Sequence, residues 1–115
     1  VDDDVKDKAI QAAIKIRDKY QADVTIKYLN QSSYGLFNQD KKAREWFDVG
    51  AEFVDIIGGL LKADAGREEE HLDILLATAK RMGKMVHVHV DEINLPEEHE
   101  TEMLAKKTIE QLDSK

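Results

Sequence analysis

Residues 84–91 read KMVHVHVD, an alternation of apolar and polar side chains that is typical of a β-strand. Two segments of similar character precede it, ADVTIKYLN at residues 22–30 and FVDII at residues 53–57. Segments with helical spacing of apolar residues separate these predicted strands. Strands that are separated by helices need crossover connections, so they pair in parallel. The pattern therefore predicts an α/β fold with a three-stranded parallel sheet.

Four segments have apolar residues three and four positions apart, as in a helix: residues 4–20, 39–50 and 67–82, and a last segment that begins at Pro96. Pro is favoured in the first turn of a helix, and Gly83 is a suitable stop for the third segment. We expect Leu112 on the apolar side of the last helix, and Gly58 and Gly59 to end the second strand. The predicted order is α-β-α-β-α-β-α, three parallel strands with four helices.

The composition excludes several classes of protein. The net charge of −7 argues against a nucleic-acid surface, and the absence of Cys excludes disulfides and thiolate metal sites. The apolar runs are far shorter than the ~18–20 residues that span a bilayer, so we expect no membrane partner and a cytoplasmic location. We expect residues 1–115 to form a single domain. The chain is too short for a complete (β/α)₈ barrel, which needs about 250 residues.

The predicted strand at residues 84–91 also carries the strongest candidate site. Side chains alternate along a strand, so His87 and His89 lie on the same face and can bind one Zn²⁺ or Fe²⁺. Asp91 and Glu92 follow at the carboxyl end, where α/β proteins place their active sites. A carboxylate there can act as a base toward water. The alternative is a half-polar strand with no ligand, because a metal site needs further donors.

Other polar residues are weaker candidates. Gln31, next to Asn30 at the end of the first predicted strand, offers an amide that can recognise an amide-like or heterocyclic substrate. Lys62, Asp64 and Arg67 follow the second strand, and we interpret them as a solvated loop and helix start. His71 and His99 occur at Glu-rich helix starts, where we expect solvated or capping side chains rather than metal ligands.

The segment VHVHVDEI (residues 86–93) is preceded by FVDIIGG (53–59) and by AGREEEHLDILLATAKRMGK (65–84). Together they resemble the metal-dependent amidohydrolases, most of all the cytosine deaminase branch. The resemblance extends over residues 9–111, and its most specific part is the run from His89 to Glu92. It implies a partial TIM (β/α)₈ barrel, in which this chain is the middle third.

The resemblance also implies roles for three residues. His89 matches a metal ligand, and Glu92 matches the residue that moves protons between the attacking water and the substrate. Gln31 falls near the amide that holds the pyrimidine, while His87 has no counterpart. The parent enzyme would use Zn or Fe and act on a small cyclic amidine or amide such as cytosine. This sequence lacks three features of the family: the HxH pair of the first strand, the His of the sixth strand and the Asp of the eighth strand. We therefore expect the 115 residues to be inactive without the rest of the enzyme, and to bind no metal by themselves.

Two other interpretations remain open. A three-stranded sheet has two edges and an uncovered face, which is typical of a non-catalytic interaction module that self-associates. The third interpretation is a small metal-binding protein that uses His87 and His89 together with a ligand from outside the chain.

Overall fold

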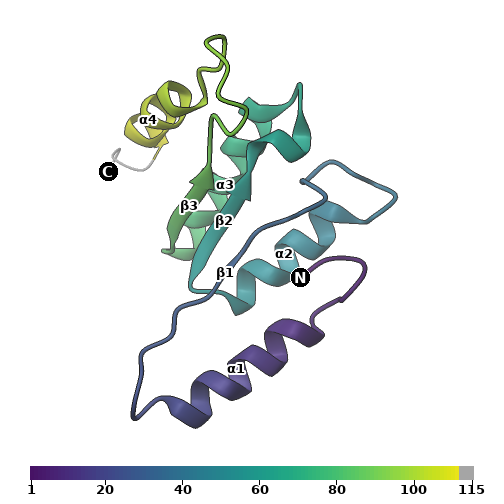
Figure 1. Cartoon of the computed structure of the whole chain (residues 1–115), viewed down its shortest axis with the longest axis vertical. Coiled ribbons are helices and arrows are strands. Elements are labelled where there is room, and N and C mark those ends of the chain that lie inside the picture. The colour runs from purple at the N-terminus through teal and green to yellow at the C-terminus, as the bar shows by residue number, and fades with distance from the viewer. Residues whose placement is uncertain (112–115) are drawn as a thin grey trace.

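The computed structural model describes residues 1–111, so the predicted position of Leu112 lies outside the described residues. The elements alternate along the chain (Figure 1). They are α1 (Lys8–Tyr20), β1 (Leu29–Asn30), α2 (Ala43–Phe53), β2 (Ile56–Leu60), the 3₁₀ helix η1 (Leu61–Asp64), α3 (Glu68–Met82), β3 (Met85–His89) and α4 (Glu100–Gln111). The predicted order of three strands and four helices is confirmed. None of the helices described over residues 1–111 is long and apolar enough to cross a membrane.

The sheet has the order β1-β2-β3, and both pairs of strands are parallel, as predicted. The register places Gly58 opposite His87 and Leu60 opposite His89. The first strand is much shorter than residues 22–30, because only Leu29 and Asn30 lie opposite residues of β2. Because Leu60 and His89 are the last residues of their strands and lie opposite each other, the carboxyl ends of β2 and β3 lie side by side.

The core lies between the sheet and two of the helices, α2 and α3, whereas none of the residues described in α1 and α4 is fully buried. Figure 1 shows α3 behind β2 and β3, and α3 contacts both strands. Its predicted apolar stripe is buried, with Leu72, Leu75 and Leu76 fully inaccessible to solvent. Burying one such side chain contributes about 1.5–3 kcal/mol, so this stripe fixes α3 on the sheet. The helix ends at Met82, and Gly83 has the left-handed backbone predicted for a helix stop.

Several further element boundaries differ from the prediction: α1 begins at Lys8 rather than at residue 4, α2 covers Ala43–Phe53 rather than 39–50, and β2 covers Ile56–Leu60 rather than 53–57. Gly58 and Gly59 lie inside β2, because the sheet and α3 approach too closely for a side chain: a Cβ on Gly59 would lie 2.1 Å from Leu75 Cδ1. The last helix begins at Glu100 rather than at Pro96. Pro96 instead lies in a turn, in which the N–H of Glu98 donates to the carbonyl of Leu95.

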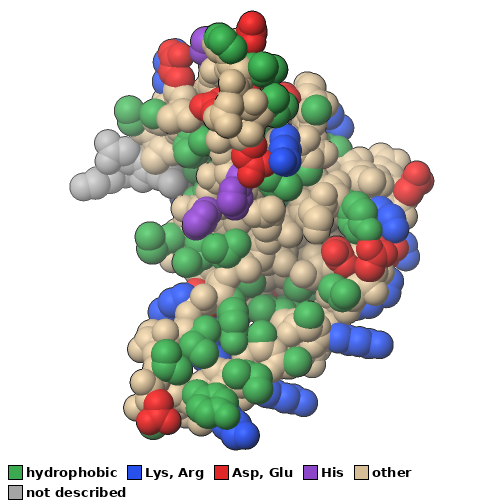
Figure 2. All heavy atoms as spheres, in the orientation of Figure 1, with side chains coloured by type: hydrophobic (Ala, Val, Ile, Leu, Met, Phe, Trp, Pro, Cys, Tyr) green, Lys and Arg blue, Asp and Glu red, His purple; other side chains and the backbone are tan. Residues whose placement is uncertain are grey.

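The opposite face of the sheet is open to solvent. Alternation along the strands and the register place Leu29, Ile56 and Met85 on this face, and Met85 is 74% exposed. His87 and His89 lie on the same face as Met85. Figure 2 shows histidine side chains on this surface, with hydrophobic side chains to one side and charged ones to the other. The strand arrangement therefore presents the candidate site on an uncovered face.

Candidate active site at the carboxyl ends of the strands

Glu92 joins the ends of two neighbouring strands. Its Oε1 lies 3.2 Å from Nδ1 of His89, the last residue of β3. Its Oε2 lies 2.9 Å from Nζ of Lys62, which belongs to η1 directly after β2. The carboxylate is thus held between an imidazole and an ammonium group. Because the Glu92 side chain is 28% exposed, it is still accessible to a small molecule. The structure thus brings Lys62, which is distant in the sequence, to His89 and Glu92, which are three positions apart.

His87 and His89 point to the same side of β3, as predicted. Their ring centroids are 5.5 Å apart, and the rings are tilted by 37°. Nδ1 of His89 faces a carboxylate, which leaves Nε2 available for a cation, and metal-bound histidines usually have this arrangement. Over the residues that the structure describes, the only close group of three His or acidic donors is Asp91, Glu98 and Glu100. The donor type of His89 therefore fits a divalent cation, but a complete set of ligands needs residues from outside this stretch.

Asp91, the other carboxylate predicted at the end of β3, is a helix cap. Its Oδ1 accepts the N–H of Glu100 at 3.0 Å, and its Oδ2 accepts the N–H and the hydroxyl of Thr101. In return, Glu100 Oε1 accepts the N–H of Asp91 at 2.8 Å. The Thr101 hydrogen bond is the main reason why the pKa of Asp91 is lowered. Asp91 therefore holds the start of α4 and is not free to act as a base.

Gln31 follows β1 directly and is half-buried. In the described part of the chain, no hydrogen bond joins its amide to His89 or Glu92. The neighbouring Asn30 is buried toward α2, since a Cβ on Gly50 would lie 2.5 Å from Asn30 Nδ2. Asn30 is therefore part of the packing, and the prediction for Gln31 stays untested.

Sequence reasoning missed a buried pair beside this site. His71 is fully buried, contrary to the expectation of a solvated side chain, and its Nδ1 lies 2.5 Å from Asp64 Oδ2. Asp64 is buried as well, which contradicts its interpretation as a solvated loop residue. Burial lowers the pKa of His71, and the Asp64 charge only partly opposes this effect. The signal was present, because His71 is four positions from Leu75 and so lies on the buried stripe of α3.

A cavity of about 380 Å³ lies beside Lys62 at the same end of the sheet. Apolar side chains of Ile93 and Met103 form part of its wall. The remaining lining residues are Lys62, Ala65, Glu68, Glu69, Glu97, Glu98, His99 and Glu100. The segments after β2 and β3 therefore border an open cavity whose lining includes Lys62, the ion-pair partner of Glu92.

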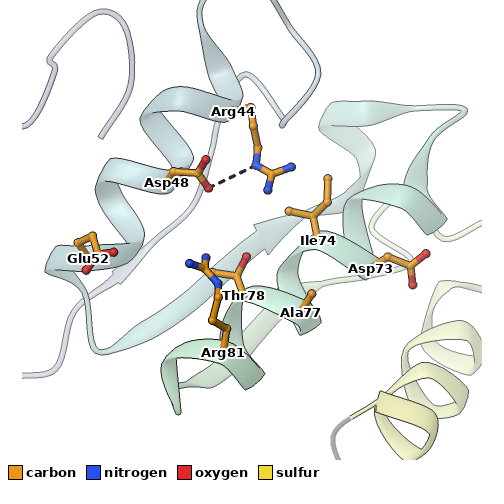
Figure 3. A pocket seen from close by; sticks show the side chains of 8 residues that line it. All are labelled: Arg44, Asp48, Glu52, Asp73, Ile74, Ala77, Thr78 and Arg81. Atoms are coloured by element: carbon orange, nitrogen blue, oxygen red, sulfur yellow. Dashed lines mark hydrogen bonds and ion pairs between the residues drawn. The ribbon is translucent and has the colours of Figure 1, made fainter.

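A second groove, of about 590 Å³, lies between α2 and α3 (Figure 3). Arg44 and Asp48 of α2 form an ion pair at 3.3 Å along one side of it, and Thr78 and Arg81 of α3 lie on the other side. None of the residues that line it belongs to the group around Glu92. This groove lies on the helical layer and is separate from the candidate site.

The fold is similar to a segment of a known enzyme. A crystal structure of 5-methylcytosine deaminase from Klebsiella pneumoniae with phosphonocytosine matches 95% of this chain with a TM-score of 0.85 and 22% identity. The same deaminase with 5-fluorocytosine matches 92% of the chain with a TM-score of 0.81 and 23% identity. The chain covers 27% and 26% of the deaminase chain in these two structures. The predicted partial-barrel fold is thereby confirmed.

An uncharacterized protein of Haemophilus influenzae is 50% identical over 113 residues. The match covers 96% of this chain and 40% of that protein. No family model matches the chain. The chain therefore spans less than half the length of the relative and about a quarter of the deaminase.

Proposed function

We propose that residues 1–115 form a partial barrel domain of a metal-dependent amidohydrolase, and that the whole protein deaminates or hydrolyses a cyclic amidine or amide such as cytosine. One observation carries this proposal: Glu92 is held between His89 and Lys62 at the carboxyl ends of two parallel strands. The similarity in fold to a deaminase that binds cytosine analogues supports the choice of substrate.

In this proposal His89 binds a divalent cation, Zn²⁺ or Fe²⁺, through Nε2 while Nδ1 faces Glu92. His87 is a second candidate donor on the same face. When bound, such a cation lowers the pKa of water and polarises the substrate. The other ligands would come from parts of the protein outside these residues, so we expect the chain alone to be inactive.

Glu92 is the proposed general acid–base. It would take a proton from the attacking water and deliver it to the leaving nitrogen, a role that contributes typically 10²–10⁴-fold to the rate. Its two oxygens have different neighbours, His89 and Lys62, which fix the direction of the carboxylate. Gln31 would hold the amide-like edge of the ring through its own amide.

The test uses the full-length polypeptide that contains these residues, loaded separately with Zn²⁺ and Fe²⁺. Ammonia release is measured with cytosine, 5-methylcytosine and other cyclic amidines, and the bound metal is quantified. The proposal expects turnover of at least one cytosine-like compound and loss of bound metal in His89→Ala. Metal-loaded protein that turns over none of these compounds would exclude the proposed substrate class.

A non-catalytic α/β module that self-associates is the second candidate. The observation that favours it is the uncovered sheet face, which carries the exposed side chains of Met85 (74%) and Leu29 (39%), together with the two edge strands β1 and β3. Sedimentation of the 115-residue chain tests this candidate. It expects a concentration-dependent dimer or larger species that Met85→Lys weakens, whereas a stable monomer argues against it.

A further inference from the structure

One buried carboxylate joins three parts of the chain. The Asp64 side chain is 5% exposed, and its Oδ2 lies 2.5 Å from Nδ1 of His71 in α3. The same oxygen accepts the backbone N–H of Leu36 at 2.7 Å. Leu36 lies between β1 and α2, whereas Asp64 ends η1 after β2. Asp64 therefore connects the loops at the carboxyl ends of two strands to the helix behind them.

The loop after β1 is shaped around this carboxylate. Gly35 has a φ of +74°, and a Cβ at this position would lie 2.2 Å from Asp64 Oδ1. The N–H of Gly35 donates to the carbonyl of Ser32 at 2.9 Å, which closes a tight turn directly after Gln31. Because the turn and the anchored Leu36 are consecutive, the position of Gln31 depends on the contact between Leu36 and Asp64.

Asp64 also fixes the segment that carries Lys62. Both residues belong to η1, whose four residues are Leu61–Asp64. The carbonyl of Asp64 accepts the N–H of Arg67 at 2.8 Å, which joins η1 to the start of α3. Because Lys62 contacts Glu92 at 2.9 Å, a movement of η1 would change the surroundings of Glu92 as well.

His71 holds the carboxylate from the helix side. Its side chain is 1% exposed, and within residues 1–111 its Nε2 has no hydrogen-bond partner. That nitrogen lies next to β2, since a Cβ on Gly59 would be 3.4 Å away. A neutral imidazole must carry its proton on Nδ1 to donate to Asp64. With its proton on Nδ1, the imidazole holds the Asp64 carboxylate in this position.

We propose that Asp64 and His71 are positioning residues of the proposed active site, which hold the Gln31 loop and the Lys62 turn in one fixed relation around Glu92. Neither residue would touch the substrate, so they act through Gln31 and Lys62. This inference rests on the proposed function, because it concerns how a ring substrate is held against Glu92. A purely structural pair would change stability but not substrate binding.

The experiment compares Asp64→Ala, Asp64→Asn and Asp55→Ala in the full-length, metal-loaded polypeptide. Asp64→Asn keeps an oxygen that can accept from both Leu36 and His71. Asp55 is the matched control, because it also accepts a backbone N–H and pairs with Arg17. It lies at the amino end of β2, away from Glu92. Measurements use conditions in which denaturation curves show every variant to be folded.

We expect Asp64→Ala to lower kcat/KM for a cytosine-like substrate at least 10-fold, mainly through a higher KM. Asp64→Asn should recover most of this loss, and Asp55→Ala should leave kcat/KM within 2-fold. Unchanged kinetics in folded Asp64→Ala would overturn the proposal. If Asp64→Ala does not fold, Gly35→Ala displaces the same carboxylate and must show the same KM effect.

A second readout separates this proposal from the proposed function. Amide exchange and chemical shifts are measured in the same variants by NMR, without substrate. We expect the Leu36 N–H to exchange at least 10-fold faster in Asp64→Ala, with shift changes at Gln31 and Lys62 that are absent in Asp55→Ala. A wild-type protein without turnover would refute the proposed function alone, whereas unchanged Gln31 and Lys62 signals would refute the positioning role.

Discussion

Gly35→Ala tests the packing around Asp64 most sharply. Gly35 has a φ of +74°, and an alanine Cβ there would lie 2.2 Å from Oδ1, 2.6 Å from Cγ and 2.8 Å from Oδ2 of Asp64. An L-residue in this backbone region costs about 1 kcal/mol. The carboxylate must also move, which breaks its hydrogen bonds with Leu36 and His71. Buried polar groups that lose their partners cost about 1–3 kcal/mol each, so we expect a total loss of about 3 kcal/mol or more.

Gly66→Ala is the matched control. Gly66 has a φ of +88°, and a Cβ there would meet no described atom within 4 Å. Its replacement therefore introduces the backbone strain alone, about 1 kcal/mol. Urea denaturation followed by circular dichroism gives the free energy of unfolding of both variants. We expect Gly35→Ala to be less stable than Gly66→Ala by about 2 kcal/mol or more. A difference below about 0.5 kcal/mol would refute the role assigned to the Asp64 carboxylate.

Three further predictions concern the core, the helix cap and pH. Leu75→Ala removes a fully buried side chain and should lower the free energy of unfolding, measured in urea, by about 2–5 kcal/mol. Ile109 is exposed, so Ile109→Ala should change it by about 0.5 kcal/mol or less. Similar values for both variants would contradict the assigned core. Asp91→Ala removes the acceptor for the N–H groups of Glu100 and Thr101, so hydrogen exchange of both amides should become faster while that of the α3 amides should not. Unchanged exchange at Glu100 and Thr101 would show that Asp91 does not cap α4. Burial lowers the pKa of His71 in the folded state, so the unfolded chain binds the proton more readily. The stability that this residue contributes is therefore present above about pH 6.5, the usual pKa of histidine, and is lost as the pH falls below that value. Imidazole NMR signals should therefore show His71 titrating below pH 6.5, and a midpoint above that pH would contradict its burial as the dominant effect.

The order of the elements could be predicted because it depends on local patterns. Alternation in residues 84–91 and the helical stripe around Leu75 each specify one type of element, and crossover connections then require parallel pairing. The limits of β1 could not be predicted, because they depend on which residues lie opposite Ile56 and Ile57. Gly58 and Gly59 were misinterpreted for the same reason, since the close approach of α3 is a tertiary property.

The candidate site was predicted in part. The common face of His87 and His89 follows from strand alternation, and the structure confirms it. The contact between Lys62 and Glu92 joins residues 30 positions apart, which no local pattern indicates. Asp91 and Glu92 are adjacent carboxylates at a strand end, and only the position of α4 distinguishes the cap from the candidate base. The roles of His89, Glu92 and Gln31 in catalysis stay predictions.

The most direct test of the proposed function compares Glu92→Gln with Glu102→Gln in the full-length, metal-loaded protein. Glu102 is an exposed residue of α4 that pairs with Lys106, so its replacement controls for the loss of one carboxylate. Ammonia release from a cytosine-like substrate and bound metal are measured together. We predict that Glu92→Gln retains its metal but loses about 10²-fold or more in kcat, while Glu102→Gln behaves as the wild type. Full turnover by folded Glu92→Gln would contradict the account.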